Sequence, residues 1–270
     1  MPFPYKTILL TGASSGLGLA LTERLLSTGR TVIAVSRTAT TSPDLQALAR
    51  KHPSLLHLED FDCLSLPAIP AWTAAILARF PSLDCVLLNA GIQRLLDFTS
   101  PQTISLATHD REWTLNYTSP LHTLTAFLPH LIARAPAPAA VVLMSSGLAI
   151  VPIPTVPNYC ASKAALHSLC WSLRAQLADG DGTGHVRVVE ILPPAVHTRL
   201  HDGQPEAAQR NLAKVAMSVE DFLEDAWGQL EGGSNDEIPV GGIKARIISV
   251  ETEKRQMFQV MSEMLKQQKS

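Results

Sequence analysis

The sequence predicts an α/β fold, a doubly wound parallel sheet of about seven strands with helices on both faces. Two observations support this prediction. Short runs of Val, Ile and Leu alternate with helical patterns, and such runs, bounded by Gly or Pro, are typical of strands buried on both faces. A glycine-rich turn, TGASSGLG, joins the first strand to the first helix, as in Rossmann-type nucleotide-binding folds. The 270 residues fit one large domain.

The individual elements follow from the periodicity of the apolar residues. The expected strands cover residues 6–12, 31–37, 55–62, 84–91, 139–146 and 186–194. The expected helices cover residues 18–29, 43–52, 68–80, 111–135, 158–178 and 218–230. The helix at 111–135 is expected to bend near Pro120, because proline lacks the backbone N–H that a helix interior requires.

No repeat or linker divides the chain, so residues 1–270 are expected to form a single domain. The polar, glycine-containing segment from 197 to about 235 is expected to be an insertion or lid beside the substrate site. Residues from about 252 to 270 are expected to form a C-terminal helical tail.

The composition excludes several classes of protein. The formal net charge is −2, which gives no electrostatic reason to expect nucleic acid or an anionic membrane surface as a partner. No apolar run approaches the roughly 20 residues that span a bilayer, and the N-terminus lacks the pattern of a signal peptide. The four cysteines show no metal-binding spacing. We therefore expect a cytoplasmic protein with reduced thiols and no metal site.

The glycine turn is suited to bind a pyrophosphate. Gly12 permits the sharp turn, Gly16 lets the backbone approach the phosphates, and Gly18 allows the helix to pack closely on the strand. The helix N-terminus then offers unpaired N–H groups and a partial positive charge. Although a plain strand-to-helix turn can contain three glycines, this one lies at the first such junction of an α/β pattern.

The end of the second strand favours NADP(H) over NAD(H). Enzymes that prefer NAD usually carry an acidic residue here for the ribose 2′-hydroxyl, but this chain has Ser36 and Arg37. A charge-assisted contact from Arg37 to a 2′-phosphate would contribute about 1.5–3 kcal/mol. The alternative is a solvated arginine with no partner.

Tyr159 and Lys163 lie four residues apart, so a helix places them on one face. At about 4 Å and an effective dielectric constant near 20, an ammonium stabilises a phenolate by about 4 kcal/mol. Such a contact would lower the pKa of the phenol from about 10 by up to roughly three units. The sequence therefore predicts a tyrosine that works as an acid or base near neutral pH.

Further motifs accompany this pair in a fixed order. They are LLNAG at 87–91, Asn116 in the long helix, and Ser146 at the end of a strand, thirteen residues before Tyr159. Together with the glycine turn, they resemble the short-chain dehydrogenase/reductase family along most of the chain. The segments HPSLLHLEDFD, SSGLAIVPIPTVPNYCASKAALHSL and VVEILPPAVHTRL are similar to its DltE-like oxidoreductase branch.

The resemblance implies a role for each catalytic residue. Tyr159 would be the acid/base, and Ser146 would hydrogen-bond the substrate oxygen. Lys163 would bind the nicotinamide ribose and lower the pKa of Tyr159. Asn116 would hold a water that links Lys163 to solvent.

The resemblance also implies a nucleotide site. Asn89, Ala90 and Gly91 would line the adenosine ribose, Asp62 would contact adenine, and Thr198 would meet the nicotinamide carboxamide. The expected cofactor-binding residues are Gly12, Ser14, Ser15, Gly16, Leu17, Gly18, Ser36, Arg37, Asp62, Asn89, Ala90, Gly91, Tyr159, Lys163, Pro193, Val196 and Thr198.

Some of these residues have structural alternatives. Asn116 would instead satisfy backbone groups at the bend near Pro120, Ser145 would replace Ser146, and Asp62 would cap a helix. His167 and Cys160 are expected to pack within the fold rather than to act in catalysis. The sequence also departs from the family at Pro193-Pro194, where proline-glycine is usual.

The substrate site is expected to be formed by residues 147–158 and by the segment after 197. The first is apolar, which indicates a hydrophobic carbonyl compound or alcohol. The pocket-lining residues suggested on this basis are Ile153, Val156 and Trp227, with His197, Arg199 and His201 available to a polar or acidic group.

The sequence thus predicts an NADP(H)-dependent oxidoreductase that interconverts a carbonyl, or an imine, and the corresponding alcohol or amine. A homodimer or homotetramer is expected from the family resemblance. Two alternatives are a catalytically silent nucleotide-binding sensor or scaffold, and an epimerase or dehydratase of the same family.

Overall fold

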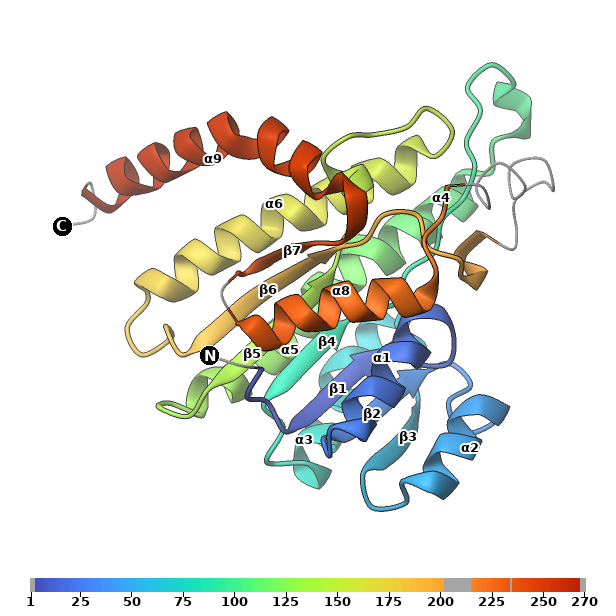
Figure 1. The fold of residues 1–270 in the computed structure, drawn as a ribbon, viewed down its shortest axis with the longest axis vertical. Helices are drawn as coiled ribbons and strands as arrows, with labels where there is room; N and C mark the ends of the chain where they lie inside the picture. The colour runs from blue at the N-terminus through green and yellow to red at the C-terminus, as the bar shows by residue number, and fades with distance from the viewer. Residues whose placement is uncertain (1–2, 202–214, 234, 268–270) are drawn as a thin grey trace.

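A seven-stranded parallel sheet forms the centre of the protein, with the strand order β3-β2-β1-β4-β5-β6-β7 (Figure 1). The computed structural model describes residues 3–201, 215–233 and 235–267. All neighbouring strands pair in parallel, as predicted. The strands are β1 (Thr7–Thr11), β2 (Thr31–Ser36), β3 (Leu56–Asp60), β4 (Cys85–Leu88), β5 (Ala139–Met144), β6 (Val186–Leu192) and β7 (Glu237–Pro239).

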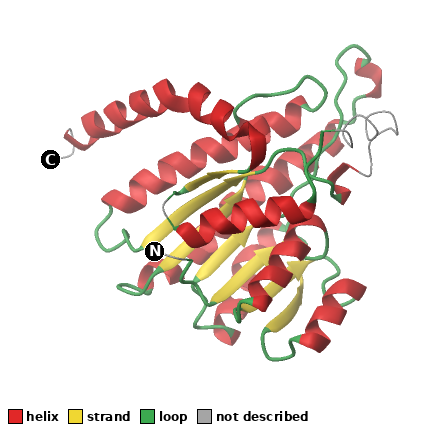
Figure 2. Ribbon diagram, in the orientation of Figure 1, coloured by secondary structure: helices red, strands yellow, loops and turns green. Residues whose placement is uncertain are grey.

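Helices cover both faces of the sheet, as Figure 2 shows. The helices α1 (Gly16–Ser27), α2 (Pro43–Lys51) and α8 (Val219–Gly232) contribute to the apolar core on one face. The core on the other face contains residues of α3 (Ile69–Arg79), α5 (Ser119–Ala133) and α6 (Pro157–Asp179). Two further helices are α4 (Leu106–Trp113) and α9 (Lys244–Gln267).

The sheet reverses its winding at β1, which pairs with β2 on one side and with β4 on the other. At such a reversal the connections after the two strands turn away from each other and leave a crevice at their carboxyl ends. The glycine turn follows β1 and the NAG motif follows β4. Both therefore open into the same crevice.

The long central helix differs in detail from the prediction. It begins at Leu106, earlier than the predicted residue 111, and a π-helical turn (Thr114–Thr118) separates α4 from α5. Pro120 lies two residues after the end of this turn, where its missing N–H removes one donor of the regular α-helical pattern. The predicted irregularity is thus a π turn, a common cause of helix bending.

Two differences concern the C-terminal part of the chain. The tail helix starts at Lys244 rather than near 252. The part of the predicted lid from 219 to 232 is α8, whose Phe222, Ala226 and Leu230 are buried in the core. Residues 202–214 lie outside the described residues. The predicted lid therefore remains a proposal, and it concerns residues 198–200 and 215, which line the cavity described below.

Trp227 lies in the α8 layer and not at a substrate pocket, contrary to the sequence-based suggestion. Its ring is 6.1 Å from that of Phe3, and the Arg30 guanidinium lies 5.1 Å from its centre. Arg30 also donates to Glu231 at 2.8 Å. The tryptophan thus helps to fasten the N-terminus to α8.

The core is tested most directly at Phe127, which is fully buried with its ring edge-on to Trp72 at 5.7 Å. Because Phe127→Ala leaves a cavity in the α5 layer, we expect it to lower the free energy of unfolding by about 3–5 kcal/mol. Urea unfolding followed by circular dichroism measures this change. Phe98→Ala is the control, since Phe98 is 70% exposed and its loss should change stability by less than about 0.5 kcal/mol.

Candidate active site

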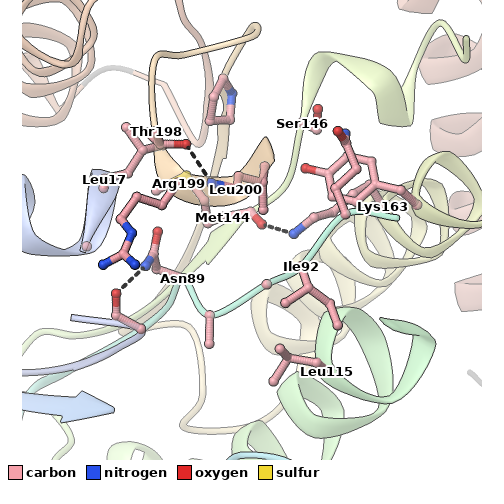
Figure 3. A pocket seen from close by; sticks show the side chains of 18 of the residues that line it. Leu17, Asn89, Ile92, Leu115, Met144, Ser146, Lys163, Thr198, Arg199 and Leu200 are labelled. Atoms are coloured by element: carbon pink, nitrogen blue, oxygen red, sulfur yellow. Dashed lines mark hydrogen bonds between the residues drawn. The ribbon is translucent and has the colours of Figure 1, made fainter. Parts of the chain in front are cut away.

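A cavity of about 950 Å³ lies at the carboxyl ends of the central strands and is lined by residues from the glycine turn to Tyr159. Every residue that the sequence suggested for nucleotide binding lines it, and so does Ser146. In Figure 3, Ser146 and Lys163 lie on one side of this pocket, and Leu17, Thr198 and Arg199 lie on the opposite side. Of the predicted catalytic residues, Asn116 does not line the cavity.

The glycine turn is shaped as a phosphate-binding loop requires. Gly12 has φ +70°, and a Cβ atom there would lie 2.9 Å from the Cα of Ala90. A Cβ atom at Gly18 would lie 2.1 Å from the carbonyl oxygen of Gly12, so no side chain fits. The Ser15 side chain caps no N–H group of α1, which leaves the first-turn donors available to an anion. The loop therefore fits a dinucleotide pyrophosphate.

Asn89 holds the two strand ends together. Its side-chain amide donates to the carbonyl oxygens of Thr11 at 3.0 Å and Gly12 at 3.3 Å. The Thr11 hydroxyl in turn accepts from the backbone N–H groups of Asn89 at 3.0 Å and Ala90 at 3.1 Å. The NAG motif thus fixes the glycine turn as well as lining the cavity.

The adenosine end of the cavity is lined by Ser36, Arg37 and Asp62. Asp60 pairs with Ser36 across β2 and β3, but its carboxylate accepts from the backbone N–H and the hydroxyl of Thr40. Asp60 also does not line the cavity. The Asp62 carboxylate accepts from the Leu64 N–H at 3.0 Å, which closes a local turn. Asp62 does not cap α3, which was its alternative role.

Tyr159, Lys163 and Ser146 meet at the other end of the cavity. Lys163 is buried, and its Nζ donates to the Met144 carbonyl oxygen at 2.8 Å. The same Nζ lies 5.7 Å from the centre of the Tyr159 ring. The Ser146 hydroxyl accepts from the Leu148 N–H at 3.1 Å, so its hydrogen remains available to Tyr159 or to a substrate oxygen.

The predicted lowering of the Tyr159 pKa is wrong. Burial raises the pKa of Tyr159 above its ordinary value, and the hydrogen bond with Ser146 offsets this only in part. The Lys163 amine donates to the Met144 carbonyl oxygen, and among the described residues the structure gives it no hydrogen bond to the Tyr159 hydroxyl that would offset this burial. Burial also lowers the pKa of Lys163 to about 8, against the opposing charges of Glu190 and Cys170.

Asn116 lies in the π turn, and its fully buried side chain anchors the loop after the NAG motif. Its Oδ1 accepts from the Ile92 N–H at 3.0 Å, and its Nδ2 donates to the Ile92 carbonyl at 2.9 Å and to the Ser162 hydroxyl at 3.1 Å. The Asn116 side chain therefore hydrogen-bonds backbone groups of this loop. Its alternative role was to bond backbone groups at the helix bend. A role in holding water near Lys163 remains a prediction.

The nicotinamide-side loop is held to the rest of the site through backbone contacts. Gly147 donates its N–H to the Pro193 carbonyl at 2.9 Å, which joins the two strand ends that flank Ser146. A Cβ atom at Gly16 would lie 3.1 Å from that of Thr198, so this loop closely approaches the glycine turn. Val196 forms a bridge with Met217.

The apolar wall matches the prediction in part. Ile153 lines the cavity together with Val151 and Leu148. Val156 does not; it is buried in a small cluster with Tyr159. Arg199 lines the cavity, His197 is exposed outside it, and the side chain of His201 lies outside the described residues.

A buried carboxylate that the sequence analysis missed supports the start of α6. Glu112 is fully buried and accepts from the Asn158 side chain at 2.6 Å and from the Arg94 N–H at 2.6 Å. Asn158 also donates to the His109 carbonyl at 3.1 Å. Glu112 and Asn158 thus join α4, the loop after β4 and the start of α6. The polar Asn158 directly before Tyr159 was the sequence feature that could have indicated such a contact.

His167 joins three elements behind the site. Its Nδ1 is 2.8 Å from a Glu190 oxygen of β6, and its Nε2 is 2.9 Å from a Glu251 oxygen of α9. Burial lowers the pKa of His167, but the two carboxylates outweigh this effect and hold it above its ordinary value. His167 therefore packs in the fold as predicted, but as a charged pairing group. Cys160 is buried as a free thiol.

Within the described residues, no helix is long and apolar enough to cross a membrane. The described residues also contain no group of three or more His, Cys, Asp or Glu side chains placed to hold a metal ion.

Comparisons with known proteins agree with this geometry. The family model for short chain dehydrogenase matches residues 6–209. The chain is 34% identical over 236 residues to the uncharacterized oxidoreductase DltE of Bacillus subtilis, covering 87% of this chain and 88% of that protein. The chain belongs to the short-chain dehydrogenase/reductase family, and the resemblance to the DltE-like branch is confirmed.

Solved structures of the same family share the fold. A short chain dehydrogenase from Burkholderia cenocepacia, in complex with NADP, aligns with a TM-score of 0.74 and 23% identity over 97% of this chain and 99% of that one. A family member from Burkholderia phymatum, in complex with NAD, aligns with a TM-score of 0.79 and 20% identity over 94% and 96% of the two chains. These structures confirm the predicted sheet.

The lowered pKa of Lys163 predicts how activity depends on pH. Below a pH of about 8 the amine is charged, and above it the charge that supports the active site is lost. We expect kcat/KM for the nicotinamide nucleotide to be level below about pH 8 and to fall above it, because this parameter reports ionisations of the protein before the nucleotide binds.

Lys163→Arg provides the control, since a guanidinium keeps its charge in this range. The fall should then move above about pH 10 in whatever activity the variant retains. A wild-type profile that stays level to about pH 10 would contradict the assignment.

Proposed function

We propose that the protein is an NADP(H)-dependent oxidoreductase that interconverts a ketone or aldehyde and its alcohol. The observation that carries this proposal is the convergence of Ser146, Tyr159 and Lys163 at one end of a cavity whose other end carries the glycine turn and Arg37. A nucleotide-binding scaffold would need the second set of residues but not the first. Imine reduction is included, because the same acid can protonate a nitrogen.

The roles of the residues follow from their surroundings. When bound, the nicotinamide would supply the hydride. Tyr159 is held in its protonated form by burial, which suits a proton donor to the substrate oxygen. The Ser146 hydroxyl accepts from Leu148 and is left to donate to the same oxygen. Lys163 uses one N–H for Met144 and keeps others for ribose hydroxyls.

The raised pKa of Tyr159 also bears on direction. Carbonyl reduction needs the protonated phenol, which burial favours at neutral pH. Alcohol oxidation needs the deprotonated form, which burial disfavours. We therefore propose that near pH 7 Tyr159 rests in the form that carbonyl reduction needs, while the net direction follows the concentrations of the reactants.

The preference for NADP(H) is supported by the adenosine end of the cavity. Arg37 lines it, and the neighbouring Asp60 carboxylate is occupied by Thr40. The relatives do not decide the question, since one solved structure contains NADP and another NAD.

The mechanism is tested by Tyr159→Phe, which removes the proton donor and keeps the ring. We expect kcat to fall by about 100- to 10,000-fold while NADPH affinity changes little. The decrease in nicotinamide absorbance with a panel of ketones and aldehydes measures kcat, and fluorescence titration measures NADPH binding. Unchanged turnover would rule out this role for Tyr159.

The adjacent serines provide a matched control for the same measurement. Both serines line the cavity, but the hydrogen bond with Tyr159 is made by Ser146. Ser146→Ala should therefore lower kcat strongly, whereas Ser145→Ala should lower it much less. The opposite result would assign the substrate contact to Ser145.

The cofactor preference is tested by Arg37→Gln. We expect kcat/KM for NADPH to fall about tenfold, a value reduced for the exposure of this arginine, with little change for NADH. Arg50→Gln on α2 is the control, since Arg50 is exposed and does not line the cavity. A wild-type preference for NADH would overturn the proposal.

A further inference from the structure

The charges along the cavity are unevenly distributed. Among the described residues, the cavity is lined by one carboxylate, that of Asp62, and by several cationic side chains. Asp62 and Arg37 belong to the adenosine end, and Lys163 contacts Met144 and Tyr159. Arg199 lies beside Thr198, across the pocket from Lys163 (Figure 3). Two further arginines, Arg94 and Arg111, have no part in the proposed hydride transfer.

Arg94 and Arg111 lie at the Tyr159 end of the cavity. The Arg94 N–H donates to Glu112, which also accepts from Asn158, the residue before Tyr159. Arg111 precedes Glu112 in α4, and both arginines line the cavity. This chain of short contacts places the two cationic residues beside the reacting end, not the nucleotide end.

Neither arginine has its charge neutralised by a residue that the structure describes. The Arg94 guanidinium donates to the uncharged carbonyl of Gln93 at 2.7 Å. Arg111 forms no ion pair within the described ranges. The nearby Glu112 carboxylate is fully buried, accepts from the Arg94 N–H and the Asn158 amide, and lies 3.6 Å from the His109 Nδ1. No ion pair joins Glu112 to either guanidinium within the described structure, and the two arginines outnumber this one carboxylate.

Apolar side chains line the same end of the cavity. Ile92 and Leu115 come from the side of Arg94 and Arg111, and Val151 and Ile153 come from the loop that follows Ser146. Figure 3 shows Ile92 and Leu115 close together on one side of the pocket. Such a surface favours a hydrocarbon chain, while arginines favour carboxylate or phosphate through paired N–H donors.

We infer that the substrate is an amphipathic anion, a carbonyl compound whose apolar chain bears a carboxylate or phosphate group bound by Arg94 and Arg111. This inference rests on the proposed function and adds to it the chemical class of the substrate. The anionic group is held by α4 and the loop after β4, and the carbonyl lies between Ser146 and Tyr159.

The test compares charged substrates with neutral counterparts of nearly the same size. The probes are 4-oxopentanoate and 6-oxoheptanoate, their methyl esters and primary amides, and an oxoalkyl phosphate of matching length. With NADPH and the wild-type protein, we expect kcat/KM to be about tenfold higher for an anion than for its neutral counterpart, mostly through KM. Comparison of the carboxylate with the phosphate identifies which anion fits.

Arg94→Gln and Arg111→Gln should each remove most of this advantage and leave the neutral compounds unaffected. The Arg94 substitution preserves the backbone N–H that Glu112 needs. Arg50→Gln, remote from the cavity, is the matched control and should retain the full preference. Equal kcat/KM values for charged and neutral probes in the wild type would overturn the inference.

A binding measurement separates this inference from the proposed function. Hexanoate and hexanamide, which lack the reacting carbonyl, are titrated calorimetrically against the protein with NADP⁺. Tighter binding of hexanoate that is lost in Arg94→Gln supports the anion site even if no probe turns over, in which case the oxidoreductase proposal fails alone. Equal binding of the two compounds by the wild type argues against the anion site whether or not neutral carbonyls are reduced.

Discussion

The hydrogen bonds between Asn89 and the β1 end are the contacts on which the rest of the site depends. β1 and β4 are neighbours in the sheet, but their connections leave in opposite directions, so nothing in the regular ladder fixes the two loops to each other. Asn89 and Thr11 supply that link in both directions. The glycine turn starts at this junction. So does the loop that leads to Arg94, which is joined through Glu112 to Asn158, the residue before Tyr159. A nucleotide would thus meet a preformed surface.

Burial determines the chemistry at the other end of the cavity. Tyr159 and Lys163 are both removed from water, and burial disfavours the phenolate and the ammonium alike. The tyrosine is therefore kept as a proton donor, while the lysine titrates near neutral pH. A bound ribose would give Lys163 new acceptors and change this balance. The apparent acid strength of the site is then a property of the complex rather than of the protein alone.

Much of this arrangement was predictable from the sequence. Strands buried on both faces leave continuous apolar runs, and residues that follow parallel strands meet at one edge, so the residues around the cavity could be named in advance. Features that depend on tertiary contacts could not be predicted from the sequence. The three-residue β7 is too short to show a periodicity, and the apolar pattern of Trp227 does not reveal which face of the sheet it covers. The direction of the Tyr159 pKa shift depends on how deeply the phenol is buried, which the spacing to Lys163 does not give.

The triad of His167, Glu190 and Glu251 has a consequence for how the C-terminus can diverge. Glu190 is the leading charge that favours protonated Lys163, and the imidazolium that shares Glu190 is itself held by a residue of the last helix. A change at Glu251 would thus alter the electrostatics beneath the catalytic helix through a buried relay, without touching the cavity wall. The last helix is thus coupled to the interior of the fold through one histidine, and Glu251 acts on that histidine from outside the cavity.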